Sequence, residues 1–142
     1  MLKVVLALGL TASVLALASC GSQSSPTSTP SGTSSGVRGI VLFSGGPYIA
    51  SSSPLPDGFG TTKLGRPYPW VTVEVRVKTG PGAGQVVAKV KPDAQALFTI
   101  SLPAGTYVLA PLVPKNGPFP MPTTIVVEPG RYARTIVRVS GP

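Results

Sequence analysis

Apolar and polar side chains alternate over much of the chain beyond its N-terminal quarter, and this period of two predicts β-strands rather than helices. The alternation is clearest in residues 70–78, where four valines fall on one face while Thr, Glu, Arg and Lys fall on the other. That pattern is typical of a strand with one buried face. We predict seven strands, at residues 37–44, 70–78, 85–91, 96–102, 106–110, 123–127 and 132–140.

Turn residues separate most of these strands. We interpret residues 79–84, which contain three glycines, as a hairpin turn because they lack the lysine and the helix of a phosphate-binding loop. Residues 45–69 and 113–122 form longer proline-rich connections, in which proline excludes regular structure. Seven short strands with no helical pattern among them indicate a seven-stranded antiparallel β-sandwich.

The N-terminal segment has a different pattern, with Lys3 followed by an apolar run that ends in small residues. These are the three parts of a secretory signal. The run is interrupted by Gly9 and is short for a membrane-spanning helix, which needs about 20 mostly apolar residues. Residues 1–19 are therefore predicted to be a signal peptide, and an uncleaved membrane anchor is the alternative.

The residues that close this run, Leu17-Ala18-Ser19-Cys20, resemble the lipobox of bacterial lipoproteins. The resemblance implies that Cys20 receives a diacylglyceryl group and becomes the first residue of the mature protein. It also accounts for the only cysteine of the chain, which cleavage by the ordinary signal peptidase would leave unexplained. Since two acyl chains give stable anchoring, we expect a lipid-anchored protein on the extracytoplasmic side of the cell membrane or the outer membrane.

Residues 21–36 consist almost wholly of Ser, Thr, Pro and Gly and carry no charge. Such a stretch has little to bury and is expected to stay disordered. We therefore divide the chain into a signal peptide (1–19), a lipidated cysteine with a disordered linker (20–36) and one folded domain (37–142). A domain of this size is long enough for a single hydrophobic core.

The chain is strongly basic, with a formal net charge of +8 at pH 7. Without Lys3, 11 Lys and Arg residues remain against 4 Asp and Glu. This balance favours anionic partners. Because the N-terminal signal directs export, we expect a membrane surface, an envelope protein or an anionic wall polymer as partner, and no nucleic acid.

The stretch from Asp93 to Tyr107 resembles the carboxypeptidase regulatory-like domain, a small transthyretin-like (prealbumin-like) β-sandwich. The resemblance lies in an acidic turn, the aromatic Phe98 on an alternating strand, and the turn at 102–105 before Tyr107, although family members often carry glycine where this chain has Leu97. It extends over most of the predicted strands and implies a folding or interaction module without catalytic activity. We predict that the Tyr107 ring lies in the core and that its hydroxyl bonds nearby backbone, as in a tyrosine corner.

The residue types that usually carry catalysis are scarce. The chain has no histidine, and its four acids are scattered singly. General acid–base catalysis usually needs a histidine or paired carboxylates, zinc needs histidine or cysteine ligands, and calcium needs a cluster of oxygens including carboxylates. We therefore predict no enzymatic activity, no metal site and no cofactor.

Four cations form the first candidate binding site. Arg76 and Lys78 lie on the polar face of one predicted strand, and Lys89 and Lys91 lie on that of the next. If the two strands pair through their turn, the four side chains form one patch that suits phosphate-rich polymers or lipid headgroups. The alternative is a solvated face whose charge prevents edge-to-edge aggregation.

Phe59, Tyr68 and Trp70 form a second candidate site, and Tyr48 and Phe119 also lie in or beside the two long connections at 45–69 and 113–122. Aromatic side chains at the end of a sandwich suit protein or glycan recognition, but they can equally pack inward and anchor the long connection. The expected function is a non-enzymatic envelope lipoprotein, a structural or protein-interaction module on the membrane surface. The alternative is a polyanion- or carbohydrate-binding protein that uses the cationic hairpin.

Overall fold

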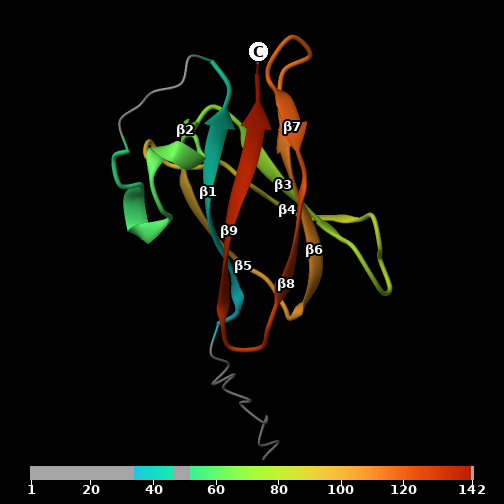
Figure 1. Cartoon of the computed structure of the whole chain (residues 1–142). Coiled ribbons are helices and arrows are strands. Elements are labelled where there is room, and N and C mark those ends of the chain that lie inside the picture. Colours follow the sequence, from blue (N-terminus) through green and yellow to red (C-terminus); the bar gives the residue numbers. More distant parts are fainter. Residues whose placement is uncertain (1–33, 47–51, 142) are drawn as a thin grey trace, which may run out of the picture. The chain divides into compact units, whose positions relative to one another are not determined.

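The structure is a computed structural model that describes residues 34–46 and 52–141. Two β-sheets face each other and enclose one hydrophobic core, so the predicted β-sandwich is confirmed (Figure 1). The strands are β1 (Gly36–Ser44), β2 (Arg66–Pro67), β3 (Thr72–Val77), β4 (Val86–Val90), β5 (Leu97–Ser101), β6 (Gly105–Leu112), β7 (Phe119–Met121), β8 (Thr123–Val127) and β9 (Tyr132–Ser140).

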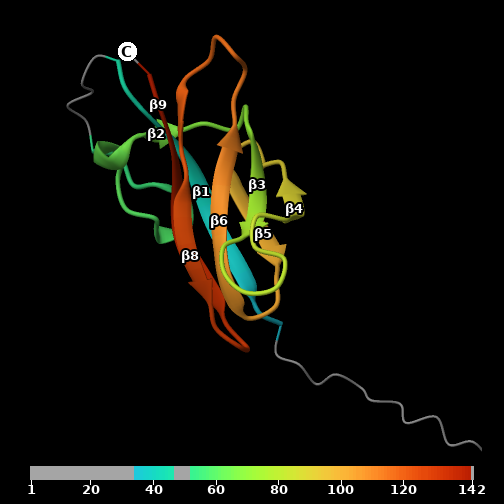
Figure 2. The same cartoon turned by 90° about the vertical axis from the view of Figure 1, so that its right-hand side faces the viewer.

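The five-stranded sheet has the order β2-β1-β9-β7, with β5 pairing along the same edge of β1 as β2. The four-stranded sheet has the order β4-β3-β6-β8. Figure 2, turned by 90° from Figure 1, shows one layer in front of the other, with β6 and β8 in front of β1. Each of the seven predicted strands corresponds to an observed one, with bounds that differ by up to two residues.

Two short strands were not predicted, because both lie in the proline-rich connections. Arg66–Pro67 pairs with Leu42 and Phe43 of β1, and Phe119–Met121 pairs with the end of β9. Both are edge strands, where one side of the backbone needs no partner and proline is therefore tolerated. The described part of the chain thus contains nine strands instead of seven.

The sandwich is also not wholly antiparallel, because its first and last strands run parallel. β1 pairs with β9 over nine residues, from Gly36 opposite Tyr132 to Ser44 opposite Ser140. Strands buried on both faces contain continuous apolar runs, and Ile40-Val41-Leu42 of β1 is such a run, with no exposed surface. Alternation along a single strand does not reveal its direction relative to a distant partner, so the sequence pattern predicted the strands but not this pairing.

The core lies between the two sheets and consists mainly of valine and leucine. The valines predicted to face inward from β3 are buried as expected, except Val77, which is partly buried. The largest side chains with less than 2 % exposure among the described residues are Ile40, Leu42, Leu109, Val37, Val41, Val73, Val75, Val127, Val137 and Val139.

The connection from residue 52 to Gly65 packs against the outer face of the five-stranded sheet. It contains two short 3₁₀ turns, Pro56–Gly58 and Thr62–Leu64. Gly65 lies against β1, since a Cβ atom there would come within 2.8 Å of the Phe43 carbonyl oxygen, and its φ of +134° also favours glycine. Leu55 and Phe59 of this connection are buried, so the segment adds a partial third layer.

Strand β4 departs from the predicted burial pattern at its first residue. Val86 was expected to point inward, but both Val86 and Val87 are exposed. A β-bulge explains this difference: Val75 pairs with Ala88 and Arg76 pairs with Val86, so that Val87 is skipped. A bulge opposes two residues to one and redirects side chains locally.

The folded domain begins slightly before the predicted boundary at residue 37. Ser35 donates its hydroxyl proton to the Leu102 carbonyl oxygen at 2.7 Å, and its own carbonyl accepts from the Leu102 amide at 3.0 Å. Next to this entry, hydrogen bonds with Ser101 and Ser34 lower the pKa of Tyr132 below its ordinary value of 10.0. The chain is therefore held against β5 and β9 from the start of β1.

Tyr107 occupies the position predicted for it. Its ring is buried, and its hydroxyl donates to the Pro103 carbonyl oxygen at 2.9 Å. The ring thereby links strand β6 to the turn that precedes it. The predicted tyrosine-corner arrangement is confirmed.

Replacing Tyr107 by phenylalanine should lower the free energy of unfolding by about 1 kcal/mol, because the Pro103 carbonyl loses its partner. For a domain of about 100 residues this corresponds to a fall in Tm of about 4–8 °C, measured by circular dichroism. Tyr132→Phe is the control, since its hydroxyl bonds Ser101 at an exposed site and its loss should matter less. An unchanged Tm for Tyr107→Phe would contradict this role.

Candidate functional site

The four cations of the first candidate site lie on adjacent strands, as the sequence predicted. Strands β3 and β4 pair antiparallel through the turn at 78–85, with Glu74 opposite Lys89. The turn that joins β3 to β4 projects from the sandwich in Figure 1. Arg76, Lys89 and Lys91 are exposed around this pairing.

A buried acid lies between these cations, which the sequence pattern did not reveal. Glu74 is only 4 % exposed although it lies on the polar face of β3. One carboxylate oxygen accepts from Nε and Nη2 of Arg76 at 2.6 and 2.5 Å, and the other lies 3.2 Å from Nζ of Lys89. The hydrogen bonds from Arg76, reinforced by Lys89 and opposed by desolvation, hold the pKa of Glu74 below its ordinary value of 4.5.

The remaining two cations of the hairpin are not engaged with Glu74 in this way. Lys78 donates from Nζ to the Thr124 hydroxyl at 3.1 Å, a neutral partner that leaves its charge uncompensated. Lys91 lies just beyond β4 and is exposed. The hairpin therefore has two cations that share one carboxylate and two whose charge is not offset by it.

The second candidate site is divided by the fold. Phe59 is 7 % exposed and belongs to the hydrophobic core, with the Arg134 guanidinium 4.3 Å above its ring centroid. Tyr68 is half-buried and packs against Phe43, with ring centroids 5.6 Å apart. These two aromatics anchor their connection to the five-stranded sheet, so they do not form a free recognition surface.

Trp70 alone of the three predicted aromatics is fully presented to solvent, with 76 % of its surface exposed. Phe119 of β7 is similarly exposed, at 70 %. Phe119, expected in the 113–122 connection, lies in the edge strand β7, and Tyr48 lies outside the described residues. Leu112 and Met121 are exposed apolar residues of the neighbouring segments.

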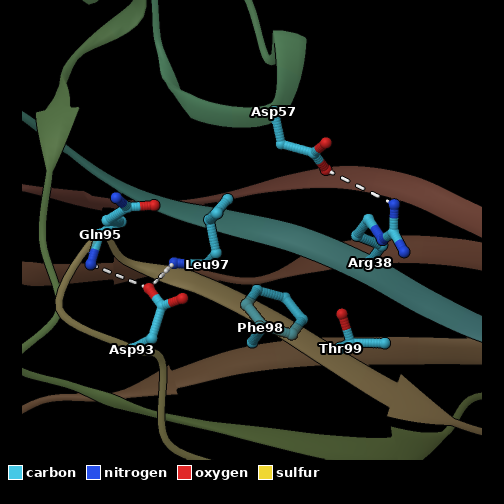
Figure 3. A pocket seen from close by; sticks show the side chains of 7 residues that line it. All are labelled: Arg38, Asp57, Asp93, Gln95, Leu97, Phe98 and Thr99. Carbon is cyan, nitrogen blue, oxygen red and sulfur yellow. Dashed lines mark hydrogen bonds and ion pairs between the residues drawn. The ribbon is translucent and has the colours of Figure 1, made fainter.

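An open pocket of about 440 Å³ lies beside β5, on the side of the five-stranded sheet. Figure 3 shows Asp57 facing Arg38 across this pocket, and the two groups form a loose ion pair at 3.7 Å. Asp93 uses one oxygen to accept from the backbone amides of Gln95 and Leu97, both at 2.9 Å. The lining consists of Arg38, Asp57, Asp93, Gln95, Leu97, Phe98 and Thr99.

The acids of this pocket stabilise the local structure. Asp93 holds the turn that leads into β5, where Ala96 adopts the left-handed conformation with φ of 64°. Asp57 pairs with Arg38 and, through its carbonyl, accepts from Arg134. Within the described residues, His, Cys, Asp and Glu form no group of three or more that would hold a metal ion.

Cys20, the predicted lipidation site, lies outside the described residues. Within residues 34–46 and 52–141, no helix is both long and apolar enough to cross a membrane.

The fold and these surfaces define an all-β protein of the two-sheet sandwich class. No protein-family model and no curated protein matches the chain. Among solved structures it is similar to the minor pilin GBS52 of the Gram-positive pathogen Streptococcus agalactiae, with a TM-score of 0.47 and 16% sequence identity, over 75% of this chain and 44% of that chain. The chain thus spans less than half the length of that pilin, and a likeness at this level carries no inference about function.

The pairing of Glu74 with Arg76 and Lys89 makes the stability of the domain depend on pH. Because the pKa of Glu74 is lower in the folded protein, the carboxylate stabilises the fold above pH 4.5, and this contribution is lost as the pH falls from 4.5 through the folded-state value. Denaturant unfolding should therefore show the wild type to be more stable than Glu74→Gln at pH 7, with a difference that shrinks as the pH falls below 4.5.

Glu128→Gln is the matched control, since Glu128 pairs with Arg131 on the exposed surface at 3.2 Å. Exposed ion pairs contribute little to stability. A Glu74→Gln variant that keeps the same difference from the wild type at pH 7 and below pH 4.5 would show that the carboxylate charge has no stabilising role.

Proposed function

We propose that the chain is a non-enzymatic lipoprotein of the bacterial envelope, whose sandwich domain is displayed outside the cytoplasm as an interaction module. One observation carries this proposal. Exposed apolar side chains gather at the end of the sandwich opposite to the point where the N-terminal segment enters it.

The strand register defines these two ends. The N-terminal segment enters at Gly36, and β1 then runs for nine residues to Ser44, a span of about 26–30 Å at 3.3 Å per residue. Ser44 pairs with Ser140 of β9, which in turn pairs with Phe119 of β7. Phe119 therefore lies one strand length away from the entry point, and Figure 1 shows the C-terminal end of β9 beside β7.

Three further exposed side chains belong to this end. Leu112 pairs with Thr72 at the start of β3, Trp70 lies two residues before Thr72, and Met121 follows Phe119 in β7. We name Trp70, Leu112, Phe119 and Met121 the distal apolar end. Large exposed apolar groups are typical of protein interaction sites, and tryptophan is enriched among the residues that dominate binding energy.

The lipid anchor is the part of the proposal that rests on sequence. The lipobox resemblance of Leu17-Ala18-Ser19-Cys20 follows directly on an apolar run. An anchor at Cys20 would be joined to the domain through Gly36, and the distal apolar end lies one strand length from that entry point.

A non-enzymatic role is supported by how the acids are used. The chain has four Asp and Glu residues and no histidine. Glu74 is paired with two cations, Asp57 with Arg38, and Glu128 with Arg131, while Asp93 holds a turn. Each acid therefore has a structural partner, and no two of them are arranged as an acid–base pair in these contacts.

The specific resemblance to carboxypeptidase regulatory-like domains is also proposed. It is supported by the stretch from Asp93 to Tyr107, which folds as an acid-stabilised turn, strand β5, a turn, and the start of β6 with the Tyr107 hydroxyl bound to Pro103. The resemblance implies an appended folding or interaction module, in agreement with the role proposed above.

Cys20→Ala should release the protein from the membrane fraction, because the variant cannot receive the diacylglyceryl group. Fractionation of cells followed by immunoblotting measures this, and metabolic labelling with a fatty acid should mark the wild type alone. Cys20→Ala protein that remains in the membrane fraction would instead favour an uncleaved N-terminal anchor.

Crosslinking in intact cells should recover an envelope protein partner, and the variant Trp70→Ala with Phe119→Ala should reduce that recovery by about tenfold or more, as expected for two anchoring side chains. Val126→Ala is the matched control, since Val126 is an exposed apolar residue at the other end of the sandwich, opposite Thr106 at the start of β6. Undiminished recovery with the double variant would exclude this end as the partner site.

A further inference from the structure

The outer face of the four-stranded sheet carries a concentration of positive charge. Strand register places Arg76, Glu74 and Lys89 on this face, because Glu74 lies opposite both Lys89 of β4 and Ala110 of β6, and alternation adds Lys91 beyond β4. Lys78 reaches the same face, since its Nζ bonds the hydroxyl of Thr124 on β8. We name this surface, with its four cations and one acid, the cationic sheet face.

The acid of the cationic sheet face does not balance its cations. Glu74 is buried beneath Arg76 and Lys89 and cancels one positive charge, which leaves three. The three other acids of the chain are engaged elsewhere, Asp57 and Asp93 beside the pocket and Glu128 with Arg131. The face therefore carries a net positive charge even when Glu74 is ionised.

Exposed aliphatic side chains lie among these cations. The bulge in β4 brings Val86 opposite Arg76 and leaves Val87 exposed beside it. On the other edge strand, Val126 of β8 pairs with Thr106 and is 60 % exposed. A sheet face that needed only solubility would have polar residues at these positions, since exposed valines on edge strands promote aggregation.

The combination of lysines with exposed aliphatic residues on one sheet face suits a planar anionic surface. Lysine and arginine near a membrane attract anionic lipid headgroups, and apolar side chains on the same face gain by burial in the headgroup region. The pocket lined by Arg38, Asp57 and Asp93 lies on the other sheet. We propose that the cationic sheet face docks on a membrane surface rich in anionic phospholipid.

This docking rests on the proposed function in one respect, because the anchor at Cys20 would hold the domain close to the membrane. The stretch from Cys20 to residue 33 can reach at most about 50 Å, which exceeds the length of β1. Phe119 and Met121 of the distal apolar end belong to β7 of the opposite sheet and would stay accessible on docking, whereas Leu112 belongs to β6 of the docking sheet.

Quenching of tryptophan fluorescence by brominated lipid tests the proposal. Trp70 is the only tryptophan of the chain, so Trp70→Phe provides a background without tryptophan. Val87→Trp then reports on the cationic sheet face, while Thr99→Trp reports on an exposed position of the five-stranded sheet. Both proteins, full-length and lipidated, are reconstituted into vesicles of brominated phosphatidylcholine. The vesicles contain either no phosphatidylglycerol or about 30 mol%, which supplies anionic headgroups.

The expected result is quenching of Val87→Trp in vesicles that contain phosphatidylglycerol, and little quenching in phosphatidylcholine alone. Thr99→Trp should show little quenching in either. Salt should abolish the signal, since the Debye length shortens to about 3 Å at 1 M. Adding Lys78→Gln or Lys91→Gln, neither of which pairs with Glu74, should weaken docking by about fivefold each.

Equal quenching at the two reporter positions, or no quenching at Val87→Trp with phosphatidylglycerol, would overturn the proposal. Retention on an immobilised phosphodiester polymer without lipid quenching would also overturn it and assign the face to a soluble polymer. Vesicle flotation separates these outcomes from failure of the anchor. A protein that lacks the anchor should still float with phosphatidylglycerol vesicles alone if the face docks, and should float with neither vesicle if it does not.

Discussion

The parallel pairing of β1 with β9 is the constraint on which the rest of the structure depends. It joins the two ends of the domain along nine residues, and it places β1 between β9 on one side and β5 with β2 on the other. A strand in this position must be apolar on both faces, as Ile40-Val41-Leu42 is. The connection that follows β1 can therefore bury Leu55 and Phe59 on the outer face, and the entry point and the distal apolar end are separated by the length of one ladder.

Local sequence patterns predict most of the fold, and the features that they do not predict depend on pairing between distant residues. The valines of β3 alternate with polar residues, so their burial follows from sequence periodicity alone. Tyr107 was also predictable, because its partner Pro103 is four residues away. The direction of β9 relative to β1 depends on residues about 96 positions apart, and no local pattern encodes it. Pro120 concealed β7, because a proline argues against a central strand but not against an edge strand.

The candidate sites likewise combine features that local patterns predict with features that depend on distant residues. Alternation placed Arg76 and Lys89 on one face, and the structure agrees. Glu74 is buried because two neighbours cover it, one in its own strand and one across the hairpin. A polar residue at this position of the sequence suggested an exposed side chain instead. The sequence left open whether Phe59 serves recognition or packs inward, because it contains no sign that the outer face of β1 and β9 is covered. Its cation–π contact with Arg134 joins residues 75 positions apart.

The cations on the two outer sheet faces have different partners, so the two faces differ in the charge that they present. On the five-stranded side, Arg38 pairs with Asp57 and Arg134 lies over Phe59. Those guanidinium groups hold the covering segments in place, and planar arginine suits such stacking better than lysine does. The four-stranded side carries three lysines and one arginine around a single buried acid. Lysine keeps a compact, hydrated charge on a flexible stem, so this side retains charge that can act on a partner outside the domain.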